Sequence, residues 1–283
     1  MMGNSARTWF ITGASTGFGR MLAEQLLKRG ERVAATARDV AKVQDLETQY
    51  PETARAFPLD VTRPAEIEKA AHQAIATFGH IDVLVNNAGY GVSGAIEEVA
   101  EGEFEPMFQT NIYGLIRTTR AFLPHFRQRR SGHIFNFSSI AGLVGGAGWG
   151  FYNTTKFAVE GFSEALAAEM KPLGVHVTVI EPGPFRTDFL GRSGKLAQRE
   201  LPEYAQTAGK ARNYLKSQSG KQPGDPQKAI EAVIAVADAP EPPIHLLLGK
   251  VALTRFRDKL STWQKEIAAW ETVTTGADYP DAR

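Results

Sequence analysis

The sequence predicts an α/β fold in which a doubly wound, seven-stranded parallel sheet is covered by helices on both faces. Two observations support this prediction. Short apolar runs alternate with stretches of helical periodicity along almost the whole chain. The runs are apolar nearly throughout, as strands buried on both faces are. Right-handed crossovers between such strands would wind them into one open sheet.

The elements follow in chain order. Seven runs are predicted to be strands: TWFIT (8–12), RVAATA (32–37), ARAFPLD (54–60), IDVLVNN (81–87), GHIFNFSS (132–139), VHVTVIEP (175–182) and IHLLLG (244–249). Five intervening segments are predicted to be helices: 17–28, 64–78, 103–129, 151–171 and 226–238. The first helix ends at Gly30, a residue type that suits a helix end.

Two further regions exceed the needs of such a sheet. Residues 184–225 are polar and contain several glycines and prolines, and an insertion of this length is typical of a substrate lid or a disordered segment. Residues 250–283 are predicted to be a C-terminal helical extension, with Trp263, Ile267 and Trp270 at helical spacing. We expect residues 1–283 to form one domain.

Composition excludes several classes of function. The chain has 32 basic and 31 acidic residues and a net charge of +1, which does not suit a nucleic-acid partner. It has no cysteine, which excludes disulfides, thiol catalysis and thiolate metal sites and fits a reducing compartment. No metal site is predicted. The N-terminus MMGNSARTW does not resemble a secretory signal, and no window approaches the ~20 apolar residues of a membrane span. We expect a cytoplasmic protein.

The stretch GASTG (13–17) allows two interpretations. Its spacing is that of the nucleophile elbow of a serine hydrolase, with Ser15 as the attacking group. Extended to Gly19, the same residues form a glycine-rich phosphate loop between a strand and a helix. Only one strand precedes Ser15, whereas an elbow needs earlier strands and a loop that supplies an oxyanion donor. The phosphate loop is therefore favoured, with the helix N-terminus facing an anion.

Polar residues that could carry catalysis lie far downstream. Tyr152 and Lys156 are spaced i and i+4, so they share one face of a helix. Ser139 ends the predicted strand 132–139, and Asn111 lies within the predicted helix 103–129. A phenol has a reference pKa of ~10, and a nearby ammonium can lower such a value by ~1–3 units. This arrangement suits a general acid and base.

These motifs resemble the short-chain dehydrogenase/reductase family. The matches are TGxxxGxG at 12–19, NNAG at 86–89, Asn111, a serine, tyrosine and lysine at 139, 152 and 156, and Pro182-Gly183 with Thr187. The resemblance covers residues 12 to 187 and implies a Rossmann-type fold. It also implies that Lys156 holds the nicotinamide ribose, that Ser139 polarises the substrate oxygen, and that Asn111 holds a proton-relaying water.

The resemblance and the phosphate loop together predict the cofactor-binding residues. They are Gly13, Ser15, Thr16, Gly17, Phe18, Gly19, Arg38, Asp60, Val61, Asn87, Ala88, Gly89, Tyr152, Lys156, Pro182, Gly183 and Thr187. The second strand ends at Ala37-Arg38 and lacks the acidic residue that would hold a ribose 2′-hydroxyl. A guanidinium can bind a 2′-phosphate with two hydrogen bonds. NADP(H) is therefore predicted rather than NAD(H), although Asp39 could be the acidic residue. Asp60 could instead cap the next helix.

The substrate site is predicted to include Ser139, Trp149, Tyr152 and Phe185, with Phe189 and Leu190 close by. An apolar wall of this kind suits a hydrophobic carbonyl or secondary alcohol, as in steroid- and retinol-type members of the family. The predicted function is an NADP(H)-dependent oxidoreductase that interconverts a ketone or aldehyde and an alcohol. The alternative is a regulatory protein that binds the cofactor without turnover. The resemblance implies a homodimer or homotetramer formed through helices 103–129 and 151–171, and Phe157, Phe162 and Met170 could contribute to that contact or face the sheet.

Overall fold

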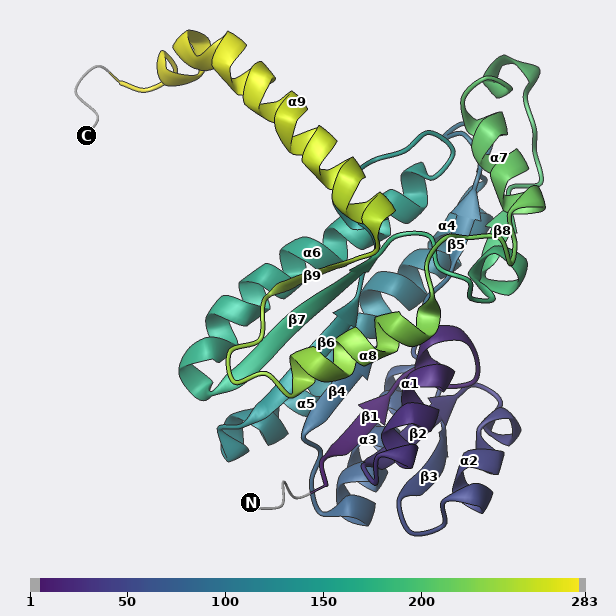
Figure 1. The fold of residues 1–283 in the computed structure, drawn as a ribbon, viewed down its shortest axis with the longest axis vertical. Coiled ribbons are helices and arrows are strands. Elements are labelled where there is room, and N and C mark those ends of the chain that lie inside the picture. Colours follow the sequence, from purple (N-terminus) through teal and green to yellow (C-terminus); the bar gives the residue numbers. More distant parts are fainter. Residues whose placement is uncertain (1–5, 280–283) are drawn as a thin grey trace.

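Seven parallel strands form the central sheet of the computed structural model, which describes residues 6–279 (Figure 1). They are β1 (Thr8–Ile11), β2 (Arg32–Ala37), β3 (Ala54–Pro58), β4 (Val83–Asn86), β6 (Gly132–Phe137), β7 (Val175–Pro182) and β9 (His245–Leu248). Their order is β3-β2-β1-β4-β6-β7-β9, and every neighbouring pair is parallel. The predicted fold class is confirmed. The N-terminal residues 1–5, where no secretory signal is expected, and residues 280–283 of the predicted extension lie outside the described residues.

Helices cover the sheet on both faces (Figure 1). On one face α1 (Gly17–Lys28), α2 (Gln44–Gln49) and α8 (Pro226–Ala237) contribute to a core that includes Leu22, Leu26 and Ile230. On the other face α3 (Pro64–Phe78), α5 (Leu115–Arg129) and α6 (Gly150–Met170) enclose Phe122 and Phe126. Burial of these apolar faces stabilises the layers by about 25 cal/mol per Å² removed from water. Helix α2 was not predicted, because its six residues are too few to show a clear period.

The predicted helix 103–129 is not one continuous α-helix. It consists of α4 (Glu101–Phe108), a π-helical segment (Gln109–Gly114) and then α5. The π segment carries Asn111, whose side chain binds the backbone of Tyr90. It ends at Gly114, where a Cβ would lie 2.8 Å from Val61 Cγ2. Segments of this kind are frequent at functional sites, and apolar periodicity does not report them.

The region 184–225 is folded rather than irregular. It contains a π-helical turn (Phe189–Ser193), β8 (Gly194–Leu196), a 3₁₀ turn (Pro202–Tyr204) and α7 (Ala208–Ser217). Strand β8 pairs with β5 (Gly91–Ser93) in a small second sheet that was not predicted, because three-residue strands carry no periodicity. After β9, α9 (Lys250–Thr275) extends away from the sheet (Figure 1). Shorter 3₁₀ turns lie at Val40–Lys42, Ile140–Gly142 and Lys171–Leu173. Among the described residues no helix combines the length and apolarity of a membrane span.

Candidate active site

The loops at the carboxyl ends of the strands surround a cavity of about 1310 Å³. Because all seven strands are parallel, these loops meet at one edge of the sheet, where open α/β folds bind ligands. Every residue predicted to bind cofactor lines the cavity except Gly19, and so do all four predicted substrate residues. Asn111 is buried behind the wall. The cavity is larger than the ~300–1,000 Å³ of a typical small-ligand site, so it has room for a dinucleotide and a substrate together.

The glycine loop between β1 and α1 forms one wall. Gly19 lies so close to the strand loops that a Cβ there would be 2.4 Å from Asn87 Nδ2 and 2.5 Å from Gly13 O. Asn87 Nδ2 donates to Thr12 O and Gly13 O at 3.0 and 3.1 Å. Thr12 Oγ1 accepts the backbone N–H groups of Asn87 and Ala88. The NNAG segment therefore holds the glycine loop in place through hydrogen bonds. Sequence reasoning missed this role of Thr12, although Thr12 stands within the TG motif.

The N-terminus of α1 is open toward the cavity. No side chain caps it, and its first turn contains no acidic residue. Gly17 has a φ of +57°, and no atom lies within 4 Å of a Cβ built on it. Free N–H groups and the positive end of the helix dipole suit a negatively charged ligand. The loop therefore fits the pyrophosphate of a dinucleotide.

The end of β2 carries the residues that would meet the adenosine ribose. Arg38 is exposed and lines the cavity, as does Lys42. Asp39 does not line it. The Asp39 side chain accepts the N–H of Ala41 at 3.2 Å and lies 3.6 Å from Lys42 Nζ, so it caps the 3₁₀ turn. At the end of β3, Asp60 Oδ1 accepts the N–H and the hydroxyl of Thr62, while Asp60 also lines the cavity.

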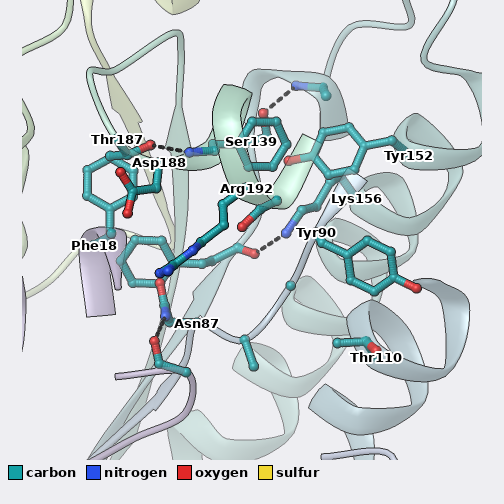
Figure 2. Close-up of a pocket in the computed structure, with 18 of the residues that line it drawn as sticks. Phe18, Asn87, Tyr90, Thr110, Ser139, Tyr152, Lys156, Thr187, Asp188 and Arg192 are labelled. Atoms are coloured by element: carbon teal, nitrogen blue, oxygen red, sulfur yellow. Dashed lines mark hydrogen bonds between the residues drawn. The ribbon is translucent and has the colours of Figure 1, made fainter. Parts of the chain in front are cut away.

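Ser139, Tyr152 and Lys156 lie together at the cavity wall (Figure 2). Tyr152 and Lys156 come from the first two turns of α6, and Ser139 follows β6 by two residues. Lys156 Nζ donates to Phe137 O at 2.7 Å and lies 5.7 Å from the centre of the Tyr152 ring. Ser139 Oγ, at the same wall, accepts the N–H of Ala141 at 3.1 Å and donates to Pro182 O at 3.3 Å. The structure thus brings three of the four predicted catalytic residues into one group.

The electrostatics of this group differ from the sequence expectation. Burial raises the pKa of Tyr152, and the neighbouring Ser139 side chain opposes that rise only in part. The expected lowering by Lys156 was wrong for the protein alone. Burial also lowers the pKa of Lys156 to about 8, against the opposing charge of Glu160. Desolvation penalises the Tyr152 phenolate and the Lys156 ammonium alike. The Tyr152 phenol is therefore held in its protonated form, which can donate a proton.

Asn111 makes its contacts within the protein. Its Nδ2 donates to Tyr90 O at 2.8 Å and Thr155 Oγ1 at 3.1 Å, and its Oδ1 accepts the N–H of Tyr90 at 3.1 Å. A Cβ at Gly89 would lie 3.1 Å from Asn111 Oδ1 and 3.8 Å from Lys156 Nζ. Asn111 therefore holds the chain that follows NNAG directly beside the lysine.

An aromatic group forms the apolar side of the cavity. The ring centres of Trp149 and Phe189 lie 5.6 Å from that of Tyr152. Phe185 instead belongs to the core under the glycine loop, where its ring centre is 5.6 Å from that of Phe18. Phe189, in the π-helical turn of the 184–225 region, therefore lies beside Tyr152, while Phe185 lines the cavity next to the glycine loop. Arg192 and Lys195 also line the cavity, and no sequence motif marked them.

Two buried carboxylates and a histidine lie on the far side of Lys156. Glu160, one turn along α6, and Glu181 of β7 are 5% and 0% exposed. His245 Nδ1 lies 2.7 Å from Glu181 Oε1 and 3.7 Å from Glu160 Oε2. These carboxylates raise the pKa of His245 to about 10, and burial raises the pKa of Glu181. The His245 imidazolium therefore ties the edge strand β9 to the helix that carries the catalytic pair.

This cluster predicts a pH-dependent contribution to stability. The pKa of His245 rises on folding from 6.5 to about 10. Its stabilisation is therefore complete below pH ~6.5 and is lost as the pH rises toward ~10. We expect the difference in unfolding free energy between wild type and His245→Gln to shrink over that range, measured by urea unfolding at several pH values. His176→Gln, at an exposed position of β7, is the matched control. A constant difference from pH 6 to pH 10 would contradict the assignment.

The chain that forms this cavity is similar to known dehydrogenases and other oxidoreductases. The family model described as short chain dehydrogenase matches residues 7–196. Oxidoreductase BOA17 of Botryotinia fuckeliana is 38% identical over 87% of this chain and 90% of its own length. Human retinol dehydrogenase 8 is 34% identical over 86% of this chain and 82% of its own. The crystal structure of a short-chain dehydrogenase from Streptomyces avermitilis superposes with a TM-score of 0.91 at 40% identity and covers 98% of this chain and 100% of that one.

Two solved structures with bound cofactor are also similar. The closed form of a serine dehydrogenase complexed with NADP+ has a TM-score of 0.73 at 30% identity, over 85% of this chain and 94% of that one. The 3-ketoacyl-(acyl-carrier-protein) reductase of Brucella melitensis, complexed with NADH, has a TM-score of 0.70 at 27% identity, over 85% and 96%. Similar folds therefore accept both forms of the dinucleotide.

Proposed function

The chain belongs to the short-chain dehydrogenase family, and from that premise we propose that it is an NADP(H)-dependent oxidoreductase that interconverts a hydrophobic ketone or aldehyde and its alcohol. Membership of this family implies that the chain is an oxidoreductase that uses a nicotinamide cofactor. The observation that carries the proposal is the grouping of Ser139, Tyr152 and Lys156 at the wall of a cavity whose opposite wall is the glycine loop.

The proposed roles follow from the contacts of each residue. A nicotinamide bound between the glycine loop and Lys156 would supply the hydride for reduction, or accept it in the oxidation of the alcohol. Tyr152 donates its phenolic proton to the carbonyl oxygen during reduction and takes a proton from the alcohol in the reverse direction. The Ser139 hydroxyl, which donates to Pro182 O in the protein alone, turns to donate a hydrogen bond to the same oxygen, where negative charge develops. Lys156, held by Phe137 O, supplies positive charge beside the phenol and would hold the ribose. Asn111 positions the backbone beside Lys156 and would hold the relaying water there.

The preference for NADP(H) rests on the end of β2. Arg38 faces the cavity, whereas the nearest carboxylate, Asp39, is occupied in capping the following turn. A guanidinium can bind a 2′-phosphate through charge-assisted hydrogen bonds, and a carboxylate there would repel it. Such bonds contribute about 1.5–3 kcal/mol each, or roughly 10- to 100-fold in affinity.

Arg38→Ala is therefore expected to lower the ratio of kcat/KM for NADPH over NADH by roughly 10- to 100-fold, mainly through KM for NADPH. The measurement is the initial rate with each cofactor at fixed substrate. Asp39→Asn is the matched control, because it removes the one neighbouring carboxylate while leaving Arg38 in place. An unchanged ratio in Arg38→Ala, or a selective loss of NADH activity in Asp39→Asn, would reverse the assignment.

The substrate class is inferred from the apolar side of the cavity. Trp149 and Phe189 flank the Tyr152 ring and leave an apolar surface beside its hydroxyl. Retinol, named in the human relative, is a long apolar alcohol. A panel of ketones of increasing apolar length, followed by NADPH consumption, tests the proposal: kcat/KM should rise with apolar length. A preference for short charged carbonyls would argue against it.

A further inference from the structure

Helix α9 presents an apolar stripe to solvent. All residues from Leu260 to Tyr279 are exposed, and four large apolar side chains line up among them: Leu260 (40%), Trp263 (53%), Ile267 (63%) and Trp270 (63%). The first turns of α9 contact the body of the protein through Ala252, which is buried, and through Lys259, which donates to Leu143 O. Beyond them the helix projects freely (Figure 1). Contiguous exposed apolar residues of this size mark an interaction site.

The spacing of this stripe is that of a coiled coil. Leu253, Leu260 and Ile267 are seven residues apart, and so are Phe256, Trp263 and Trp270. The two series alternate at intervals of three and four, which places them at the a and d positions of three successive heptads. A helix that only lay on a protein surface would need a broader stripe, so the pattern specifies another helix as the partner.

The charged residues that flank the apolar stripe indicate which helix is the partner. Basic residues flank the stripe in the first half of α9, at Lys250, Arg257 and Lys259, and acidic residues flank it in the second half, at Glu266 and Glu271. In an antiparallel pair of identical helices, g positions face g positions and e positions face e positions. Glu271 would then face the basic e positions of the second copy, Lys250 and Arg257. Lys259 is held by its own protomer, through Leu143 O and the rings of Phe157 and Trp263. In a parallel pair Glu266 would face Glu271, which is repulsive.

We propose that the exposed face of α9, Leu253 to Trp270, is a self-association surface that pairs with α9 of a second copy of this chain in an antiparallel coiled coil centred near Trp263. The helices through which family members are expected to associate include α6, which the α9 surface adjoins at its start: Lys259 Nζ lies 4.8 Å from the centre of the Phe157 ring. Of the residues considered for that contact, Met170 is in the core, while Phe157 is 41% exposed. The α9 surface therefore supplies one two-fold contact in addition to any formed through α6.

The first test is the mass of the full-length protein in solution. Ile267→Lys is expected to halve the mass measured by sedimentation at a given concentration and to shift the Trp263 and Trp270 emission to longer wavelength, with kcat/KM unchanged. Because residue 267 is exposed, the substitution does not affect the folded protomer. Ser261→Lys adds the same charge on the opposite, polar side of α9 and should leave the mass unchanged. Equal masses for wild type and Ile267→Lys at all concentrations would overturn the proposal.

The second test reports the orientation of the pair. The chain has no cysteine, so a short bis-maleimide reports only on introduced thiols. A mixture of Lys250→Cys and Glu271→Cys proteins, both altered at exposed e positions, should cross-link into a mixed dimer far more than either protein alone. Glu271→Lys should weaken association, and Lys250→Glu/Glu271→Lys should restore it. Absence of the mixed cross-link would overturn the antiparallel pair. The wild-type protein could instead sediment with anionic lipid vesicles while Ile267→Lys does not. That result would show that the partner of α9 is a membrane surface and not a second copy.

Discussion

Tyr152→Phe is expected to lower kcat/KM by roughly 10²- to 10⁴-fold while leaving the fold and cofactor binding intact. The substitution removes only the hydroxyl, and the phenyl ring can keep its contacts with Trp149 and Phe189. A positioned acid or base contributes about 10²–10⁴-fold to a rate. The measurements are steady-state kinetics, thermal unfolding and cofactor titration by fluorescence.

Tyr90→Phe is the matched control for this prediction, since it removes a hydroxyl that lines the same cavity (Figure 2). We expect it to keep activity within a few-fold of wild type. Near wild-type turnover in Tyr152→Phe would remove the assignment of the general acid. Equal losses in both variants would show that any phenol in the cavity matters, and that Tyr152 has no special role.

Gly19→Ala is expected to have the second largest effect, on stability and on cofactor binding together. Helix propensity alone predicts the opposite, because alanine is more favourable than glycine within a helix by ~1 kcal/mol. The added Cβ, however, would lie 2.4 Å from Asn87 Nδ2 and 2.5 Å from Gly13 O. The Asn87 side chain is fixed by two backbone carbonyls, so the glycine loop must shift instead. We expect a loss of about 1–3 kcal/mol in unfolding free energy, the usual cost of overpacking, and at least a tenfold loss of NADPH affinity.

Two other glycine variants serve as references for the Gly19→Ala measurement. Gly161→Ala lies in α6 with no atom within 4 Å of the new Cβ, so it should be neutral or stabilising. Gly17→Ala has the same free space but a φ of +57°, so it should cost roughly 1 kcal/mol. Chemical denaturation and NADPH titration of the three proteins give the order. A Gly19→Ala protein as stable as Gly161→Ala would contradict the close approach of the helix and the strand loops.

The predicted strands and most helices agree with the structure because each buries a large, regular apolar surface. Strands β2 and β7 have the bounds that their apolar runs predicted, and so do helices α1 and α3. The catalytic motif was equally readable, because the i, i+4 spacing of Tyr152 and Lys156 fixes a shared helix face. The π-helical segment at Gln109–Gly114 could not be predicted from the sequence. Its geometry depends on the contact of Asn111 with Tyr90, a residue on a different element.

By itself the sequence determined the order of the strands along the chain, the position of the glycine loop and the identity of the reacting side chains, since these follow from local periodicity and spacing. The tertiary structure alone decided that Phe189 rather than Phe185 lies beside Tyr152, that Asn87 braces Gly13, and that α9 projects from the body. It also set the raised pKa of Tyr152. Burial and packing depend on residues distant in the chain, and no local pattern records which of them will meet.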